Sequence, residues 1–157
     1  MASSLAPDSV NLVRQIDALH ALTIVRIERG MSSRSLCELA NLSSNSIAEW
    51  RRGRRAPQLS NFIRLAQTLG YEVVLVDGKD AATDFRDLTA CIDRIDVERR
   101  AKKVGLYEME LQAGVSVRTY YSWWNEDRIP TIANLVALAE TFGFSVIMRR
   151  VPVGTDA

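Results

Sequence analysis

The sequence contains few of the residues from which metal centres and hydrolytic active sites are built. Its 157 residues include one histidine and two cysteines. His20 lies in a segment rich in apolar residues, where packing or surface roles are more common than catalysis. No Cys/His set has the spacing of a metal site, and no glycine-rich loop follows an expected strand. We therefore expect no enzymatic activity, no metal and no cofactor.

Long hydrophobic runs are also missing. No apolar stretch reaches the roughly 20 residues that a membrane-spanning helix needs. The first residues, Met1 to Pro7, lack the basic and then apolar order of a signal peptide. Cys37 and Cys91 are expected to be free thiols in a reducing compartment rather than a disulfide. These absences favour a cytoplasmic protein.

The chain as a whole lacks a strong excess of charge, but its charges are unevenly distributed. The net charge is +1, with 9 basic and 7 acidic residues in 1–78 and 11 basic and 12 acidic residues in 79–157. Four arginines fall within five positions, at Arg51, Arg52, Arg54 and Arg55. Composition alone fits a solvated basic turn. A guanidinium is also a rigid fork of donors for anionic oxygens, which fits a phosphate contact site.

A pattern in the first half of the chain returns 73 residues later. Aligned without a gap, Ala48–Leu75 and Tyr121–Met148 share nine identical residues, among them the pairs Trp50/Trp123, Pro57/Pro130 and Gly70/Gly143. A repeat of this length indicates two copies of one small domain rather than one larger fold. Each copy is long enough to hold a small core, although it would be marginally stable alone.

Each copy is expected to contain four helices followed by a short strand. In the first copy, Asp8 or Ser9 starts a helix that runs to about residue 29. Further helices are predicted over 33–40, over 44–52 with Ser43 as its cap, and over 59–69, with a strand over 71–76. The second copy predicts helices over 84–102, 106–113, 117–124 and 132–142, and a strand over 144–148. The residues expected to be buried on the first two helices are Val13, Ile16, Leu19, Leu22, Val25, Leu36 and Leu39.

The segment Met31–Pro57 resembles the helix-turn-helix of the Cro/XRE family of phage-repressor-like regulators. Ala40 is small where two helices cross closely. Asn41 stands where the turn requires a left-handed backbone, which glycine and asparagine adopt most readily. Ile47 and Trp50 are expected to fix the third helix on the second. The second copy keeps the small residue and the turn residue as Ala113 and Gly114.

The second copy departs from the family pattern at three places. Gln112 stands where an apolar residue of the second helix is expected, and Glu98 replaces an apolar residue of the first helix. The basic run is diluted, because Trp124-Asn125-Glu126-Asp127-Arg128 takes the place of Arg51–Arg55. The resemblance implies the same fold for both copies, but it leaves DNA contact by the second copy open.

In this family the third helix enters the major groove, and its first residues face base edges. By position, the resemblance implies base contacts for Ser44, Asn45, Ser46 and Glu49. Phosphate contacts are implied at the start of the second helix and after the third, for Ser33, Arg34, Arg51, Arg52, Arg54 and Arg55. The corresponding DNA-binding residues of the second copy are Val117, Arg118, Thr119, Ser122 and Arg128. Asparagine can pair with adenine, and arginine with guanine.

Two aromatic residues of the second copy allow a different interpretation. Tyr121 and Trp124 are unusual on a reading helix, and they fit either additional core packing or a surface that binds a protein partner. An antitoxin or antiactivator that holds a protein through its second domain is therefore the alternative function. Nearby, the sequence predicts a solvated charged helix face formed by Asp93, Arg94, Asp96, Glu98 and Arg99.

Together these patterns predict a mainly α protein of two tandem repressor-like helix-turn-helix domains, each ending in a short β-strand. The expected domains are 8–77 and 83–151, with a linker at 78–82 and flexible tails at 1–7 and 152–157. The two strands are expected to pair within the chain as a monomeric pseudo-dimer, whereas pairing between chains would give a homodimer on a palindrome. The expected function is a nucleoid-associated regulator, by default a repressor, that binds double-stranded DNA and no membrane.

Overall fold

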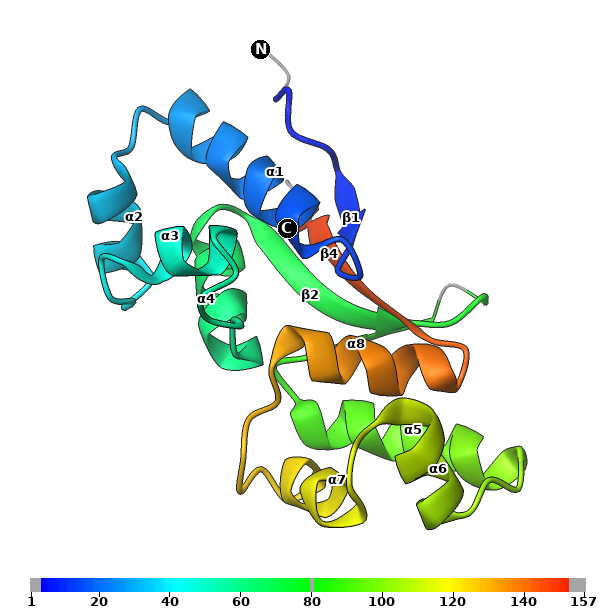
Figure 1. The fold of residues 1–157 in the computed structure, drawn as a ribbon. Helices are drawn as coiled ribbons and strands as arrows, with labels where there is room; N and C mark the ends of the chain where they lie inside the picture. Colours follow the sequence, from blue (N-terminus) through cyan, green and yellow to red (C-terminus); the bar gives the residue numbers. More distant parts are fainter. Residues whose placement is uncertain (1–3, 80, 153–157) are drawn as a thin grey trace.

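The computed structural model describes residues 4–79 and 81–152, and this part of the chain forms eight helices and four strands (Figure 1). The first half contributes β1 (Ser9–Asn11), α1 (Gln15–Glu28), α2 (Ser33–Leu39), α3 (Ser46–Arg51), α4 (Leu59–Thr68) and β2 (Tyr71–Val76). The second half contributes β3 (Ala82–Asp84), α5 (Leu88–Ala101), α6 (Leu106–Ala113), α7 (Val117–Trp124), α8 (Ile132–Thr141) and β4 (Ser145–Arg150).

The order of elements in the second half repeats the order in the first. Helices α1 and α5 both have 14 residues, and α4 and α8 both have 10. Each half opens with a three-residue strand and closes with a six-residue strand. The described chain is therefore mainly helical, and the repeat in the sequence is accompanied by a repeat of secondary structure.

The two closing strands pair with each other inside the chain, as predicted. Strands β2 and β4 run antiparallel, and their register places Val74 opposite Ile147, its equivalent in the sequence repeat. Strand β1 pairs with β4 and β3 pairs with β2, so the sheet order is β1-β4-β2-β3. When each residue is replaced by its equivalent in the repeat, the β1–β4 register becomes the β2–β3 register and the β2–β4 register is unchanged. The sheet therefore has an approximate two-fold axis between β2 and β4.

A second contact between the halves obeys the same symmetry. Gln58 and Thr131 form an isolated antiparallel bridge. The Leu59 N–H donates to the Pro130 carbonyl, and the Ile132 N–H donates to the Pro57 carbonyl, both at 2.9 Å. These residues end the loops from α3 to α4 and from α7 to α8. Backbone hydrogen bonds therefore connect the start of α4 to the start of α8.

One hydrophobic core includes residues from both halves. Phe62, Tyr71 and Leu75 from the first half and Phe142 and Met148 from the second are buried members of the same cluster. Burying a large apolar side chain contributes about 1.5–3 kcal/mol. Figure 1 shows the sheet lying between the helices of the first half and those of the second. The two halves therefore stabilise each other.

The first helix begins later than predicted. Helix α1 starts at Gln15, and Ser9–Asn11 instead form the edge strand β1. The segment before β1 is also not the predicted flexible tail from residue 4 onward, because the Tyr71 hydroxyl donates to the Pro7 carbonyl at 2.8 Å. Local sequence missed this strand because its partner, β4, lies at the other end of the chain.

Three apolar side chains predicted to be buried are exposed instead. Val13 and Ile16 are 53% and 59% exposed, and Leu39 is 68% exposed. Val13 precedes the helix and Ile16 lies in its first turn, where the late start of α1 turns them away from the core. Those buried as predicted are Leu19, Leu22, Val25 and Leu36.

The boundary between the halves also differs from the prediction. Strand β3 occupies Ala82–Asp84, which shortens both the predicted linker and the helix predicted from residue 84. Helix α5 begins at Leu88, where the Asp87 carboxylate accepts a hydrogen bond from the Ala90 N–H at 3.0 Å. Residue 80 of the linker and residues 153–157 of the predicted C-terminal tail lie outside the described residues.

Candidate nucleic-acid interface

The turn between α2 and α3 has the predicted geometry. Ala40 is buried, and Asn41 has a φ of 58°, in the left-handed region. The Leu42 N–H donates to the Cys37 carbonyl at 2.8 Å and closes the turn. Ile47 and Trp50 are buried, and α3 packs on α1 and α2, while the Trp50 ring also lies against Phe62 of α4.

Helix α3 is shorter than predicted, which changes how its polar residues are presented. It begins at Ser46, and the side chain of its N-cap residue, Asn45, makes no capping hydrogen bond. The predicted cap, Ser43, instead accepts a hydrogen bond from the Asn45 N–H at 3.4 Å. Ser44 and Asn45 are exposed in the turn before the helix, whereas Ser46 and Glu49 are half-buried. The residue set is accessible, but only part of it lies on the helix itself.

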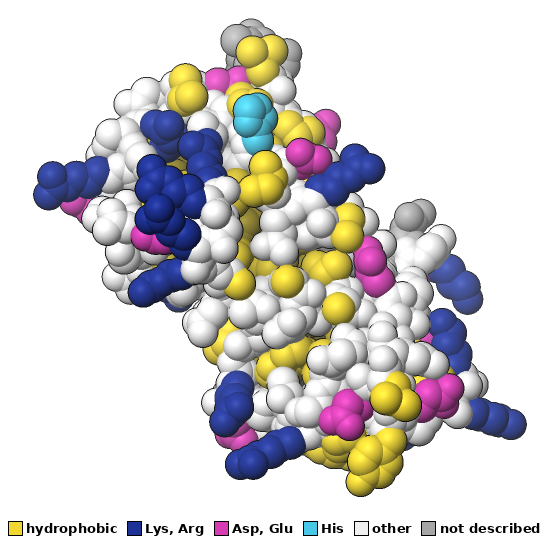
Figure 2. Space-filling view, viewed as in Figure 1, with side chains coloured by type: hydrophobic (Ala, Val, Ile, Leu, Met, Phe, Trp, Pro, Cys, Tyr) yellow, Lys and Arg dark blue, Asp and Glu magenta, His cyan; other side chains and the backbone are white. Residues whose placement is uncertain are grey.

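The four arginines surround the end of α3. Gly53 has a φ of 69° and ends the helix, after which the N–H groups of Arg54 and Arg55 donate to the Glu49 carbonyl at 3.0 and 3.4 Å. All four guanidinium-bearing residues, at 51, 52, 54 and 55, are exposed. Within the described residues none of them forms an ion pair. Figure 2 shows basic side chains gathered on this part of the surface.

One of these arginines also has a structural contact. The Arg51 guanidinium donates to the Thr23 hydroxyl on α1. Arg51 and Ser33 line the same narrow hollow between α1, α2 and α3. At the start of α2, the Ser32 hydroxyl already accepts the Ser35 N–H at 3.0 Å, and Arg34 forms an exposed ion pair with Glu38 at 3.5 Å. The predicted phosphate contacts of α2 are thus accessible, although Arg34 would exchange an existing partner.

The second turn has the same backbone form. Gly114 has a φ of 73°, and the Ser116 hydroxyl caps α7 by accepting the Thr119 N–H at 3.1 Å. Arg118 is exposed, while Val117 and Thr119 are half-buried. Gln112, the departure noted in the sequence, is exposed, as is its counterpart Leu39, so it affects no core position. A hollow of about 270 Å³ is lined by Arg118, Tyr121, Ser122, Asn125, Asp127 and Arg128.

The prediction of a solvated charged face on α5 is wrong for its central residue, Asp96. Asp96 is only 2% exposed, the one buried charged residue in the described chain. Its carboxylate accepts the Tyr120 hydroxyl at 2.8 Å and pairs with Arg99 at 2.9 Å and with Arg100 at 3.0 Å. Burial is the main cause that raises the pKa of Tyr120 far above its usual value, and the hydrogen bond to Asp96 raises it further. The network fastens α7 to α5, and sequence reasoning missed it because Tyr120 replaces the apolar Ile47 of the first half.

The two aromatic residues proposed to bind a partner differ in their exposure. Trp124 is half-buried, and its indole N–H donates to Asp93 at 3.2 Å. Tyr121 is 43% exposed and stacks on Trp124, with ring centroids 6.1 Å apart and an interplanar angle of 6°. A more exposed apolar pair, missed in the sequence, lies on α6, where Tyr107 and Leu111 are 79% and 86% exposed.

Comparison with known proteins identifies the class of the first unit. A helix-turn-helix family model matches residues 22–76, from the middle of α1 to the end of β2. No curated protein and no solved structure matches the chain. Residues 22–76 are therefore similar to a helix-turn-helix of the Cro/XRE type, which occurs in DNA-binding regulators. Within the described residues, no helix is both long enough and apolar enough to span a membrane.

Proposed function

We propose that the protein is a transcriptional regulator that binds a specific double-stranded DNA site, with α3 in the major groove. Occupying a promoter blocks transcription without any further activity, so repression is its simplest mode. The nucleoid is then its place of action. The single observation that carries this proposal is the exposed polar turn before α3, together with four arginines at the end of α3 that form no ion pair among the described residues.

The arginines and the helix have different roles in this proposal. Guanidinium groups that neutralise phosphates supply affinity that is independent of sequence and falls with salt. Side chains on base edges supply the choice of site. Asn45 is suited to adenine and Arg118 to guanine, so the two halves of the molecule would read different bases.

A single chain would serve as the complete reading unit. The β2–β4 pairing and the Gln58–Thr131 bridge relate the two halves by an approximate two-fold axis. In dimeric helix-turn-helix regulators, such an axis matches two half-sites of the operator. Here both halves belong to one chain and carry different reading residues, so the site would have two unlike halves rather than a palindrome.

The affinity part of the proposal is tested by removing charge at two matched places. DNA selected from a random pool is titrated with the wild type, with Arg52→Ala/Arg54→Ala, and with the control Lys79→Ala/Lys103→Ala, which removes the same charge from two exposed lysines outside the first helix-turn-helix. The first variant is expected to bind all sequences at least about tenfold more weakly. It should also flatten the salt dependence by about 0.9 for each phosphate that is no longer neutralised. The control should bind like the wild type. Equal affinities for all three proteins would refute the proposal.

The selection experiment also tests the two reading helices. Asn45→Ala and Arg118→Ala are each expected to weaken discrimination by about 1–3 kcal/mol, at different halves of the selected site. A site in which only the Asn45 change alters base preference would confine DNA reading to the first half of the protein.

A protein-binding regulator, such as an antitoxin or antiactivator, is the second candidate. It is favoured by the apolar pair Tyr107 and Leu111, which leaves two large side chains in solvent on α6. Its signature would be weak DNA binding at moderate salt together with a regulatory activity that is lost in Tyr107→Ser/Leu111→Ser. The arginine variant would then retain that activity.

A further inference from the structure

The sheet has two outer edges, formed by β1 and β3. At the β1 edge, the Arg150 N–H donates to the Asp8 carbonyl and the Leu12 N–H donates to the Val146 carbonyl, both at 2.8 Å. In an antiparallel pair, alternate residues direct their backbone groups to opposite sides. Ser9 and Asn11 therefore direct their N–H and carbonyl groups away from β4, toward the open edge. The Asn11 carbonyl already accepts the Arg14 N–H at 3.0 Å and keeps its second lone pair for a strand added there.

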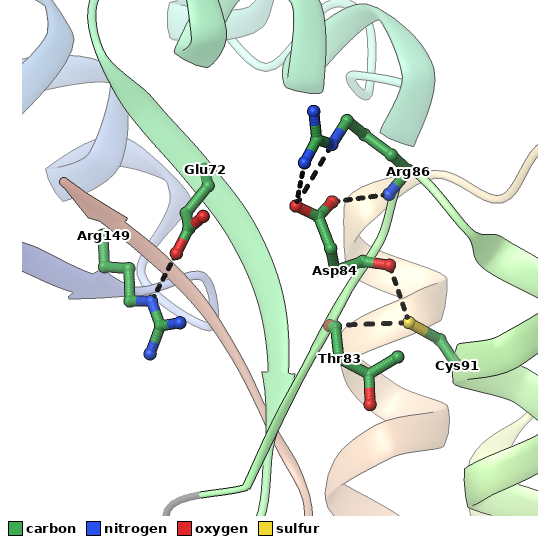
Figure 3. Close-up of polar contacts among 6 residues, drawn as sticks. All are labelled: Glu72, Thr83, Asp84, Arg86, Cys91 and Arg149. Atoms are coloured by element: carbon green, nitrogen blue, oxygen red, sulfur yellow. Dashed lines mark hydrogen bonds and ion pairs between the residues drawn. The ribbon is translucent and has the colours of Figure 1, made fainter. Parts of the chain in front are cut away.

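The two edges differ in their side chains. At the β3 edge, the Arg86 guanidinium donates to Asp84 Oδ2 at 2.9 and 3.1 Å, so that a charged pair lies beside the strand (Figure 3). Charged side chains at an edge are a common protection against pairing with another strand. In the β1 half, the residues equivalent to Asp84 and Arg86 in the repeat are Asn11 and Val13, which are uncharged. An ion pair between Asp8 and Arg150, 3.2 Å apart, lies just before the strand begins.

The β1 edge also borders a groove of about 490 Å³ between the strand and α1. Val10 and Ala21 contribute apolar surface to it, and Val13, which is 53% exposed, lies beside them. Figure 2 shows the exposed histidine, which also lines the groove, with apolar side chains around it. A strand added at this edge would therefore meet both backbone partners and space for its side chains.

The groove is lined by one positive and one negative side chain, so the grooves of two copies could complement each other. Arg14 and Asp17 both line it, and both are exposed. Neither is ion-paired to any other residue of the described chain. In a two-fold contact, residue i of one molecule meets residue j of the other and the reverse. Two copies placed edge to edge would bring Arg14 of each near Asp17 of the other.

We propose that the β1 edge docks a second copy of this chain, with the two β1 strands antiparallel and centred on Val10. In this register Ser9 of each copy exchanges backbone hydrogen bonds with Asn11 of the other, which joins the two sheets into one. The contact involves a surface that the proposed DNA-binding function does not use, so it stands independently of that function. It would place two complete reading units in one assembly.

The strength of the association follows from its size. Only three residues of each strand take part, with the side chains around them, and small interfaces are typical of weak complexes. Dimers are therefore expected to accumulate over roughly 1 µM to 1 mM protein. This association differs from the pairing of β2 with β4, which lies inside each chain.

Sedimentation velocity over this concentration range, with the full chain, tests the proposal. Ser9→Pro removes an outward N–H and leaves the bonds to β4 in place, since proline is tolerated at a strand edge on its open side. Asn11→Asp/Val13→Arg transfers the charged pair of the β3 edge to the β1 edge. Each variant is expected to lower the association constant at least about tenfold. Circular dichroism checks that both remain folded.

Charge exchange provides a rescue that a general folding defect would not show. Arg14→Asp alone and Asp17→Arg alone place like charges opposite each other and should weaken association, whereas the double exchange should restore it. A wild type that stays monomeric over the whole range overturns the proposal. Dimers that persist in both folded edge variants overturn it as well, because a different surface would then be responsible.

Discussion

The two halves of the molecule hold the helix after the turn by different chemistry. In the first half, α3 is fixed by Ile47 and Trp50 against the apolar core. In the second, Tyr120 takes the place of Ile47 and donates to the buried carboxylate of Asp96, which replaces Thr23 of the first half. The same backbone arrangement is thus compatible with an apolar contact or with a buried ionic network, provided that every polar atom in the network has a partner.

The outer surfaces of the two halves differ as much as their cores. The ion pair Arg34–Glu38 on α2 corresponds in the repeat to the exposed apolar pair Tyr107 and Leu111 on α6. Three of the four arginines at the end of α3 are replaced at the end of α7 by a tryptophan, an asparagine and an aspartate. Exposed positive charge beside the helix after the turn is therefore concentrated in the first half, whereas exposed apolar surface is concentrated on α6 of the second half.

The largest expected effect comes from breaking the network that exists only in the second half. Asp96→Ala leaves Arg99 and the Tyr120 hydroxyl without their partner, and breaking a buried ion pair in this way costs about 3–5 kcal/mol. The matched change Thr23→Ala removes an exposed contact to Arg51 and should cost below about 1 kcal/mol. Urea unfolding measures both. Similar losses for the two variants would show that the halves are held alike.

A smaller effect is expected where the halves share a backbone conformation but not a residue type. Gly53 and Glu126 occupy equivalent positions with φ of 69° and 61°. A non-glycine residue in the left-handed region costs about 1–2 kcal/mol. Gly53→Ala should therefore destabilise the protein by about 1 kcal/mol, since nothing lies within 4 Å of the added carbon. Glu126→Gly should be neutral or slightly stabilising, and thermal unfolding that shows the opposite order would contradict this account.

The smallest expected effect is on the outward faces of α2 and α6. Tyr107→Ser/Leu111→Ser and Arg34→Ala/Glu38→Ala each change exposed side chains, so each should alter the free energy of unfolding by less than about 0.5 kcal/mol. Chemical denaturation at low protein concentration provides the measurement. A loss above about 1 kcal/mol for the α6 variant alone would mean that this face is covered by a partner or another molecule in solution.

Local residue patterns were sufficient for the turns, and the sequence repeat led to the expected pairing of β2 with β4. Asn41 and Gly114 marked left-handed positions because few other residues adopt them without strain, and both were predicted correctly. Cys37 and Cys91 were correctly predicted to be free. Burial raises the pKa of Cys91 to about 12, which keeps its thiol protonated and unreactive.

The errors came from contacts between residues far apart in the chain. Strands β1 and β3 have three residues each and acquire their structure only by pairing with β4 and β2. Ile16 and Leu39 followed a helical apolar pattern but face solvent, and Asp96 followed a charged pattern but is buried. For the candidate site, the sequence placed the start of α3 two residues too early and did not reveal the apolar pair on α6.

The amino-acid sequence by itself determined the helices, the left-handed turns, the repeat and the cluster of four arginines, because each depends on residues close together in the chain. Only the tertiary structure decided that β1 pairs with β4, which aspartate is buried and how the two halves share one core. These features depend on pairings between residues more than 20 positions apart, whose geometry is set when the two halves close around the β2–β4 axis.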